Sequence, residues 1–268
     1  MSILLVGAGA MGGALLRGWV AKHVAPAERM VVVDPSPSPA VLQLASEAGV
    51  ALNPSDYGDR DYDAVVYAVK PHLLEETMRS GQPAPASAVR LSVAAGRTVA
   101  SIAAAAPKGA PVVRAMPNLP VAIGEGVVGL FAAPEVGAPE RAIAERLMEA
   151  VGAVVWTRTE EEIDALAAVS GSGPAYLFAF VEALAAAAVD RGFAPETAAL
   201  LARKTVIGSA AMLAADPSAP EDLRSAVTSK GGSTAEGLRP LLDAASGLAA
   251  LTKRAVAAAE ARNKELAN

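Results

Sequence analysis

The sequence predicts a doubly wound, mostly parallel α/β domain over residues 1–159, followed by an all-helical domain over 160–268. In the first part, short β-branched runs alternate with helical stretches, which is the pattern of a parallel sheet covered by helices. After Glu160 these runs stop and the chain becomes rich in alanine. A Gly-rich turn also separates the first run from the first helical stretch.

The predicted strands are short, nearly continuous apolar runs bounded by Gly, Pro or Asp. Such runs are typical of strands buried on both faces of a parallel sheet. We expect strands at Ile3–Val6, Met30–Val33, Ala64–Val69, Val89–Val93, Pro111–Met116, Val127–Phe131 and Ala153–Trp156. Helices are expected between them, at Ala14–Lys22, Pro39–Ala48 and Glu140–Ala150.

Proline and glycine mark the helices of the second domain. Proline suits a first helical turn and glycine a helix end, so they set most of the expected boundaries. We expect helices at Ala175–Asp190, Pro195–Ala215, a short stretch from Pro220, and Ala249–Leu266. Pro240 is expected to break the helix that begins near Thr234. Because these Ala-rich helices carry few bulky side chains, we expect them to bury their remaining faces in a homodimer.

Composition excludes several classes of protein. The 23 Lys and Arg against 28 Asp and Glu give a net charge of −5, which argues against a nucleic-acid binder. The chain has no cysteine, and His23 and His72 lie far apart, so we expect no metal site. The apolar stretch 167–189 contains Pro174 and Glu182, so it predicts a buried helix of a soluble, cytoplasmic protein rather than a membrane span.

The Gly-rich turn is the strongest motif for function. Gly7, Ala8, Gly9, Ala10, Met11 and Gly12 follow the first strand directly and precede a helix. The first glycine permits a tight turn, the second lets backbone amides approach a pyrophosphate, and the third lets helix and strand pack closely. An acid, Asp34, follows at the end of the second strand, as in a dinucleotide-binding unit.

Asp34 bears on the choice between NAD and NADP. Its carboxylate would accept hydrogen bonds from the adenosine ribose and repel a 2′-phosphate, and no Arg or Lys follows it in 35–39. This favours NAD, although Ser36 and Ser38 are able to hydrogen-bond a phosphate. Asp34 is also a common turn former. A second contact region is expected after the 64–69 strand, where Lys70 is either a ligand contact or a solvated loop cation.

A second Gly-rich loop lies in the helical domain, at 227–234. Ser233 and Glu236 have the spacing of a capping box, so a helix should begin here. Two glycines and exposed amides at a helix start would also bind a small carboxylate, and Thr234 would add a hydroxyl. The Gly-Ser-Gly-Pro run at 171–174 is interpreted as packing, and the acids at 160–162 as a solvated first turn.

Together these motifs resemble pyrroline-5-carboxylate reductase. The resemblance covers nearly the whole chain and rests on six motifs in the correct order. They are Gly7–Gly12, Ala68–Pro71, Ser92–Gly96, Arg114–Pro120, Ser170–Tyr176 and Val227–Thr234. The resemblance implies an N-terminal Rossmann domain and a helical domain that interlocks with a partner, in dimers that assemble further into decamers. It implies hydride transfer from NAD(P)H to the C=N carbon of 1-pyrroline-5-carboxylate, giving L-proline.

The resemblance also implies roles for particular residues. Thr234 would orient or protonate the imine. The substrate contacts would be Glu160, Ser229, Gly231, Gly232, Ser233 and Thr234, with Glu161 and Glu162 left open as alternatives to Glu160. Besides the Gly7–Gly12 turn and Asp34, the cofactor contacts would be Asp56, Ala68, Val69, Lys70, Pro71, Ala94, Ala95 and Asn118.

Two other interpretations stay open at this point. A β-hydroxyacid-dehydrogenase-like reductase would share the first domain but use a catalytic lysine, and neither Lys204 nor Lys230 sits in that motif. A dinucleotide-sensing dimer without catalysis would keep the Gly7–Gly12 turn but would not need Thr234.

Overall fold

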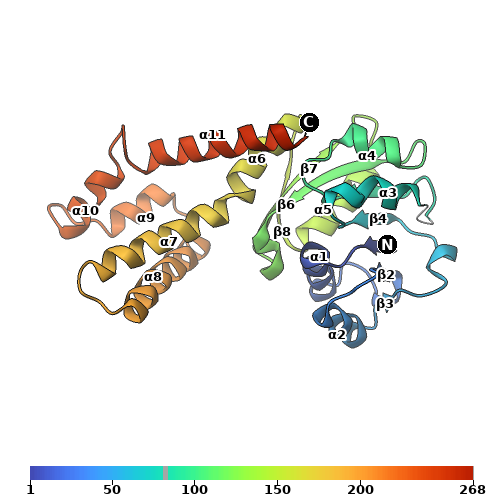
Figure 1. Cartoon of the computed structure of the whole chain (residues 1–268), viewed down its shortest axis with the longest axis horizontal. Helices are drawn as coiled ribbons and strands as arrows, with labels where there is room; N and C mark the ends of the chain where they lie inside the picture. Colours follow the sequence, from blue (N-terminus) through green and yellow to red (C-terminus); the bar gives the residue numbers. More distant parts are fainter. Residues whose placement is uncertain (81–83, 268) are drawn as a thin grey trace. The chain divides into compact units, whose positions relative to one another are not determined.

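The computed structural model describes residues 1–80 and 84–267, and Figure 1 shows the elements along the chain. These residues pack as two compact units. The first contains Met1–Gly171 together with the chain from Glu260 onward, and the second contains Ser172–Ala259. The predicted boundary at 159/160 lies before this division and stays a prediction; residue 268 lies outside the described residues.

The first unit is built on one eight-stranded sheet with the order β3-β2-β1-β4-β5-β6-β7-β8. Its strands are β1 (Ile3–Val6), β2 (Met30–Val33), β3 (Ala51–Leu52), β4 (Ala64–Tyr67), β5 (Val89–Ser92), β6 (Val112–Pro117), β7 (Gly126–Ala132) and β8 (Gly152–Trp156). All neighbouring strands are parallel except β6 and β7. The predicted mostly parallel sheet is therefore confirmed. The two-residue strand β3 was not predicted, and the strand expected over 64–69 ends at Tyr67.

Helices cover both faces of this sheet, as a doubly wound fold requires (Figure 1). They are α1 (Ala10–Ala21), α2 (Pro39–Ala48), α3 (Leu74–Arg79), α4 (Val99–Ala105), α5 (Ala138–Glu149) and α6 (Glu160–Leu166), which a π-helical turn at Ala167–Gly171 follows. The expected helix 39–48 is confirmed. Helix α1 begins at Ala10 rather than the expected Ala14, because the helix starts inside the Gly-rich turn.

Alternating strand residues divide the core between two faces of the sheet. Ile3 and Leu5 of β1 pack on the face covered by α1, α2 and α5, whereas Leu4 and Val6 pack on the face covered by α3 and α4. On the first face, Trp19 of α1 is fully buried and its indole N–H donates to the carbonyl of Leu147 in α5 (2.8 Å).

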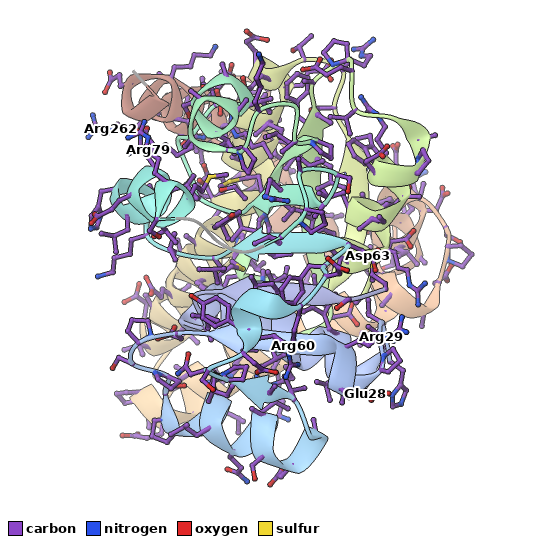
Figure 2. All side chains as sticks on the ribbon, turned by 90° about the vertical axis from the view of Figure 1, so that its right-hand side faces the viewer. Glu28, Arg29, Arg60, Asp63, Arg79 and Arg262 are labelled. Carbon is purple, nitrogen blue, oxygen red and sulfur yellow. The ribbon has the colours of Figure 1, made fainter. Side chains whose placement is uncertain are left out.

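The parallel registers place the carboxyl ends of four strands at one edge of the sheet. Val6 pairs with Val33 and Tyr67, and Tyr67 pairs with Ser92. The opposite edge holds residues that precede strands, among them Arg29 and Asp63 (Figure 2). The Gly-rich turn and the loops after β2, β4 and β5 therefore share one edge, where ligands bind in such sheets.

The second unit is entirely helical. It contains α7 (Gly173–Val189), α8 (Pro195–Ala215), α9 (Pro220–Ala226), α10 (Ser233–Leu241) and the first part of α11 (Leu248–Ala267). Helix α8 has the predicted bounds, and Pro240 lies in the last turn of α10, one residue before that helix ends. Helices α7 and α8 pack against each other, and the Tyr176 hydroxyl of α7 donates to the Ala255 carbonyl of α11 (3.5 Å).

Helix α7 corrects one expectation, because none of its residues is buried within a single chain. Its Phe178 is 55% exposed, and Leu200, Ile207 and Met212 of α8 are exposed as well. Two helical stretches, Glu160–Val189 and Pro195–Ala215, are long and apolar enough to span a membrane by length and composition. Helices that are buried in a soluble assembly pass the same test, so this observation is weak evidence for a membrane.

Trp19→Phe is expected to lower the free energy of unfolding by about 1–3 kcal/mol, because the buried Leu147 carbonyl loses its only side-chain donor among the described residues. Urea unfolding followed by circular dichroism measures the change. Trp156→Phe is the matched control, because Trp156 is half-buried and its ring lies under the Arg141 guanidinium at 5.0 Å. Equal losses in the two variants would contradict the role of the hydrogen bond.

Candidate active site

The Gly-rich turn joins β1 to α1 and leaves room for a ligand at one glycine only. Gly7 has a positive φ of 88°, and a Cβ atom there would lie 2.8 Å from the Ala68 carbonyl oxygen. A Cβ atom at Gly12 would collide with the Gly7 carbonyl. At Gly9, by contrast, a Cβ atom would meet nothing within 4 Å. Gly7 and Gly12 are thus required for packing, while Gly9 faces open space.

Gly9 is also the N-cap of α1, and no side chain of residues 1–80 or 84–267 caps this helix end. The first N–H groups of a helix have no partner inside the helix, and the helix dipole gives this end partial positive charge. An exposed glycine and uncapped amides together form a cradle for a phosphate group. The turn therefore fits the pyrophosphate of a dinucleotide.

Asp34 ties this cradle to the end of β2. One carboxylate oxygen accepts a hydrogen bond from the Ala8 N–H (2.6 Å), and the other accepts one from the Ser36 N–H (2.7 Å). Asp34 therefore forms the turn after β2 and also orients the Gly-rich loop. Each oxygen keeps a second lone pair for the hydroxyl of a ribose.

Asn53, which was not predicted from the sequence, lies beside Asp34. The predicted contact Asp56 makes no such bond to Asp34 among the described residues and pairs with another side chain. The Asn53 side chain accepts from the Asp34 N–H (2.9 Å) and donates to the Asp34 carbonyl (2.8 Å), with a positive φ of 49°. Asp56 is exposed and pairs with Arg60 at 3.0 Å. An asparagine shortly after a strand end is the signal that would have pointed to Asn53, since asparagine tolerates positive φ.

A hydrogen bond joins the loops that follow β4 and β5 at the edge of the sheet where the parallel strands end. Arg97, beyond the β5 end, donates to the Pro71 carbonyl (3.1 Å) and pairs with Glu75 (3.4 Å). Of the predicted cofactor contacts here, Ala94 is buried, Ala68 and Val69 are half-buried, and Lys70 and Ala95 are exposed. The structure thus brings the predicted segments 68–71 and 94–95 close to the Gly-rich turn, through the Gly7–Ala68 contact and through Arg97.

A pocket of about 260 Å³ opens beside these loops. All its lining residues belong to the first unit: Pro71, Ala95, Gly96, Arg114, Met116, Asp164, Ala167 and Asn263. Two predicted cofactor contacts, Pro71 and Ala95, line it, but Asn118 does not. The Asn118 side chain is buried, donates to the Ser170 carbonyl (2.9 Å) and accepts from the Val127 N–H (2.9 Å).

The three acids at the start of α6 differ in their surroundings. Glu161 and Glu162 face solvent, and hydrogen bonds lower the pKa of both carboxyls, that of Glu162 through the Arg158 backbone N–H first. Glu160 instead accepts from the Val99 N–H (2.7 Å) and from Arg114 (3.2 Å), with its side chain 23% exposed. The expected solvated first turn is therefore wrong for Glu160, which is turned inward by the buried arginine.

The Gly-rich loop of the helical domain belongs to the second unit. Gly231 has a positive φ of 72°, Gly232 is the N-cap of α10, and Ser233 and Thr234 are exposed in the first turn. The predicted helix start is confirmed, but the capping box is wrong. Among the described residues no side chain caps α10, and Glu236 pairs with Arg239 (2.9 Å) instead, so within this part of the chain the first helix amides are left for a ligand.

Comparisons with known proteins agree with this arrangement. Residues 160–266 match the family described as pyrroline-5-carboxylate reductase dimerisation, and residues 2–96 match NADP oxidoreductase coenzyme F420-dependent. The chain is 36% identical to pyrroline-5-carboxylate reductase of Pseudomonas aeruginosa, covering 99% of this chain and 96% of the relative. The chain belongs to the pyrroline-5-carboxylate reductase family.

Solved structures of the same family share the fold. The pyrroline-5-carboxylate reductase of Coxiella burnetii is 34% identical with a TM-score of 0.86, covering 100% of this chain and 98% of that one. The Plasmodium falciparum pyrroline carboxylate reductase, solved with NADP bound, is 25% identical with a TM-score of 0.80, covering 100% and 98%. The chain is accordingly an oxidoreductase that uses a nicotinamide dinucleotide, and neither alternative interpretation is favoured.

Gly9→Ala is expected to weaken NADH binding about tenfold or more while leaving the melting temperature unchanged, because its methyl group enters open space where the pyrophosphate would lie. Gly12→Ala is expected to lower both binding and melting temperature, because its methyl group collides with the Gly7 carbonyl. NADH fluorescence titration and thermal unfolding measure the two effects. Unchanged NADH affinity in Gly9→Ala would contradict the cradle.

Proposed function

We propose that the chain reduces 1-pyrroline-5-carboxylate to L-proline with NAD(P)H, and that the Gly7–Gly12 cradle and the Gly231–Thr234 loop carry its two ligand sites. The observation that carries this proposal is the full-length similarity to pyrroline-5-carboxylate reductases, together with a cradle that has open space only at Gly9. The bound dinucleotide supplies the hydride. The chain's own residues bind and orient the reactants.

Positioning accounts for much of the chemistry. The carbon of a protonated imine is already electrophilic, so holding the two reacting carbons about 3–3.5 Å apart supplies a large part of the rate. In the first unit, the cradle, Asp34 and the loops after β4 and β5 supply the dinucleotide contacts of this proposal. In this proposal, the second Gly-rich loop orients the substrate and supplies the proton-transferring group.

The loop before α10 suits a small carboxylate. Its helix start has free amides, and the exposed Lys230 adds a positive charge nearby. The exposed Thr234 lies one position after Ser233, in the first turn of α10, where its hydroxyl is free to donate to or accept from a substrate nitrogen. We therefore assign Ser229, Gly231, Gly232 and Ser233 to carboxylate binding and Thr234 to the imine.

The assembly in this proposal is a cytoplasmic homodimer formed through the helical unit, with the decamer as its further assembly. The dimerisation-family match to 160–266 and the exposed apolar side chains of α7 and α8 support the dimer. Sedimentation of the purified chain measures the oligomer.

The test of this function is oxidation of NADH and of NADPH, at equal concentrations, with 1-pyrroline-5-carboxylate. Substrate-dependent turnover is expected, with the higher kcat/KM for NADH because Asp34 repels a 2′-phosphate. Binding of NADH without turnover of the substrate would instead support a sensor.

Asp34→Asn is expected to shift the ratio of kcat/KM values toward NADPH by about tenfold, since loss of the carboxylate charge removes the repulsion of a 2′-phosphate. Asparagine keeps one oxygen that can accept from the Ala8 N–H, but its NH2 group cannot accept from the Ser36 N–H. The melting temperature of the variant therefore checks that the loop stays in place. The same assay with both cofactors measures the ratio. A ratio unchanged from the wild type would mean that the Asp34 charge does not discriminate between the two cofactors and that Asp34 acts in the turn.

Thr234→Ala is expected to lower kcat about a hundredfold, within the range for loss of a positioned proton donor. Thr234→Ser is the matched control, because it keeps the hydroxyl and should retain most of the activity. Steady-state kinetics with saturating NADH measures both. Full activity in Thr234→Ala would remove Thr234 from the reaction.

A further inference from the structure

Arg114 is a buried arginine that joins β6 to α6 in the first unit. It is 2% exposed, and its two terminal nitrogens pair with Glu160 (3.2 Å) and Asp164 (2.8 Å). Both carboxylates are themselves mostly buried, with side chains 23% and 14% exposed. Such a network is expensive to bury unless its members are well paired, so its geometry is closely determined.

Glu160 extends this network to the loop after β5. The Glu160 oxygen that pairs with Arg114 also accepts the Val99 N–H at 2.7 Å. Val99 is the first residue of α4, which the Thr98 hydroxyl caps by accepting from the Ser101 N–H (3.1 Å). Arg114 therefore holds the end of the 93–98 loop through Glu160.

Asp164 extends the network to the pocket. Arg114, Asp164, Ala95 and Gly96 all line the 260 Å³ pocket, and Asn263 near the chain end donates to the Asp164 carbonyl (3.1 Å). The Nε atom of Arg114 is buried without a hydrogen-bond partner among the described residues. Within the described residues, Arg114 therefore makes no hydrogen bond through Nε, while its two terminal nitrogens pair with the carboxylates of Glu160 and Asp164.

We propose that Arg114 is a positioning residue for the reduction, fixing the 93–98 loop through Glu160 and the pocket wall through Asp164. The inference rests on the proposed function, in which Ala94 and Ala95 of that loop lie against the cofactor. It reassigns Glu160 from touching the substrate to holding the loop, because its inward oxygen is already shared by Arg114 and Val99. Asp164 and Arg114, which sequence reasoning left without a role, become part of the active site's support.

A positioning role and a purely structural ion pair differ in what they change. Loss of a structural pair lowers the melting temperature but leaves the chemical step alone. Loss of a positioning contact misplaces the reacting groups, so hydride transfer slows and becomes the rate-limiting step of turnover. Binding of the dinucleotide as a whole should persist, because the Gly-rich cradle and Asp34 are not part of the network.

The test compares Glu160→Gln, Glu160→Ala and Arg114→Gln. Glutamine keeps an oxygen for the Val99 N–H, whereas alanine removes it, so the effect should grow from the first variant to the second. We expect kcat to fall about tenfold in Glu160→Ala, with a larger deuterium isotope effect from 4-deuterated NADH and an NADH dissociation constant within about twofold of the wild type. Arg158→Gln is the matched control, since it removes an exposed arginine paired with Glu162 of the same helix.

The outcomes separate the proposals. Variants with lower melting temperatures but wild-type kcat and isotope effect would overturn the positioning role and leave the reductase function standing. A wild-type protein that binds NADH but does not turn over 1-pyrroline-5-carboxylate would overturn both. If Arg114→Gln fails to fold, the two Glu160 variants decide the question alone.

Discussion

The close approach of the Gly7–Gly12 turn to the neighbouring strand ends is the constraint on which the rest of the structure depends. There is no space for a side chain at Gly7 or Gly12, because the Ala68 carbonyl and the Gly7 carbonyl lie too near. This contact places the start of α1 beside the loop after β4, and the Asp34–Ala8 hydrogen bond adds the end of β2. Three strand ends thus converge around the open space at Gly9, which is why one edge of a parallel sheet serves as a dinucleotide site.

Two arginines extend this order to the neighbouring loops. Arg97 bonds the Pro71 carbonyl, and Arg114 holds Val99 through Glu160, so the end of the segment between β5 and α4 is held at two neighbouring positions. Loops are ordinarily the most mobile parts of a fold, yet catalysis needs the reacting groups to be fixed within a fraction of an ångström. A planar guanidinium with several donors in a rigid fork resolves this conflict, because it bonds several acceptors at once.

Elements that depend on the local sequence pattern were predicted correctly, whereas elements that depend on contacts between distant parts of the chain were missed. The strands at 3–6 and 30–33 and the helices at 39–48 and 195–215 have strong apolar patterns or proline starts, and the structure has them at those residues. The two-residue β3, the short α4 and the antiparallel β6–β7 pair were missed, since they depend on neighbours far along the chain. At the candidate site, spacing alone linked the Gly-rich turn with Asp34, and the structure joins them by a hydrogen bond. Asn53 and the inward Glu160 were not predicted, because only the folded chain brings Asp34 and Arg114 to them.

In the helical unit, a single chain buries too few apolar side chains to form a substantial hydrophobic core. Of its hydrophobic side chains, all of which the structure describes, only Ala198 and Ala202 are buried. A unit with so little core cannot hold its own helices firmly, since burial of apolar surface is the main stabilising term in folding. The dimerisation-family match explains the exposed faces of α7 and α8, because a partner would bury them. The loop that begins α10 belongs to this same unit. In the proposed dimer, the order of the proposed substrate site would therefore be coupled to association, and protein concentration would enter its stability by mass action.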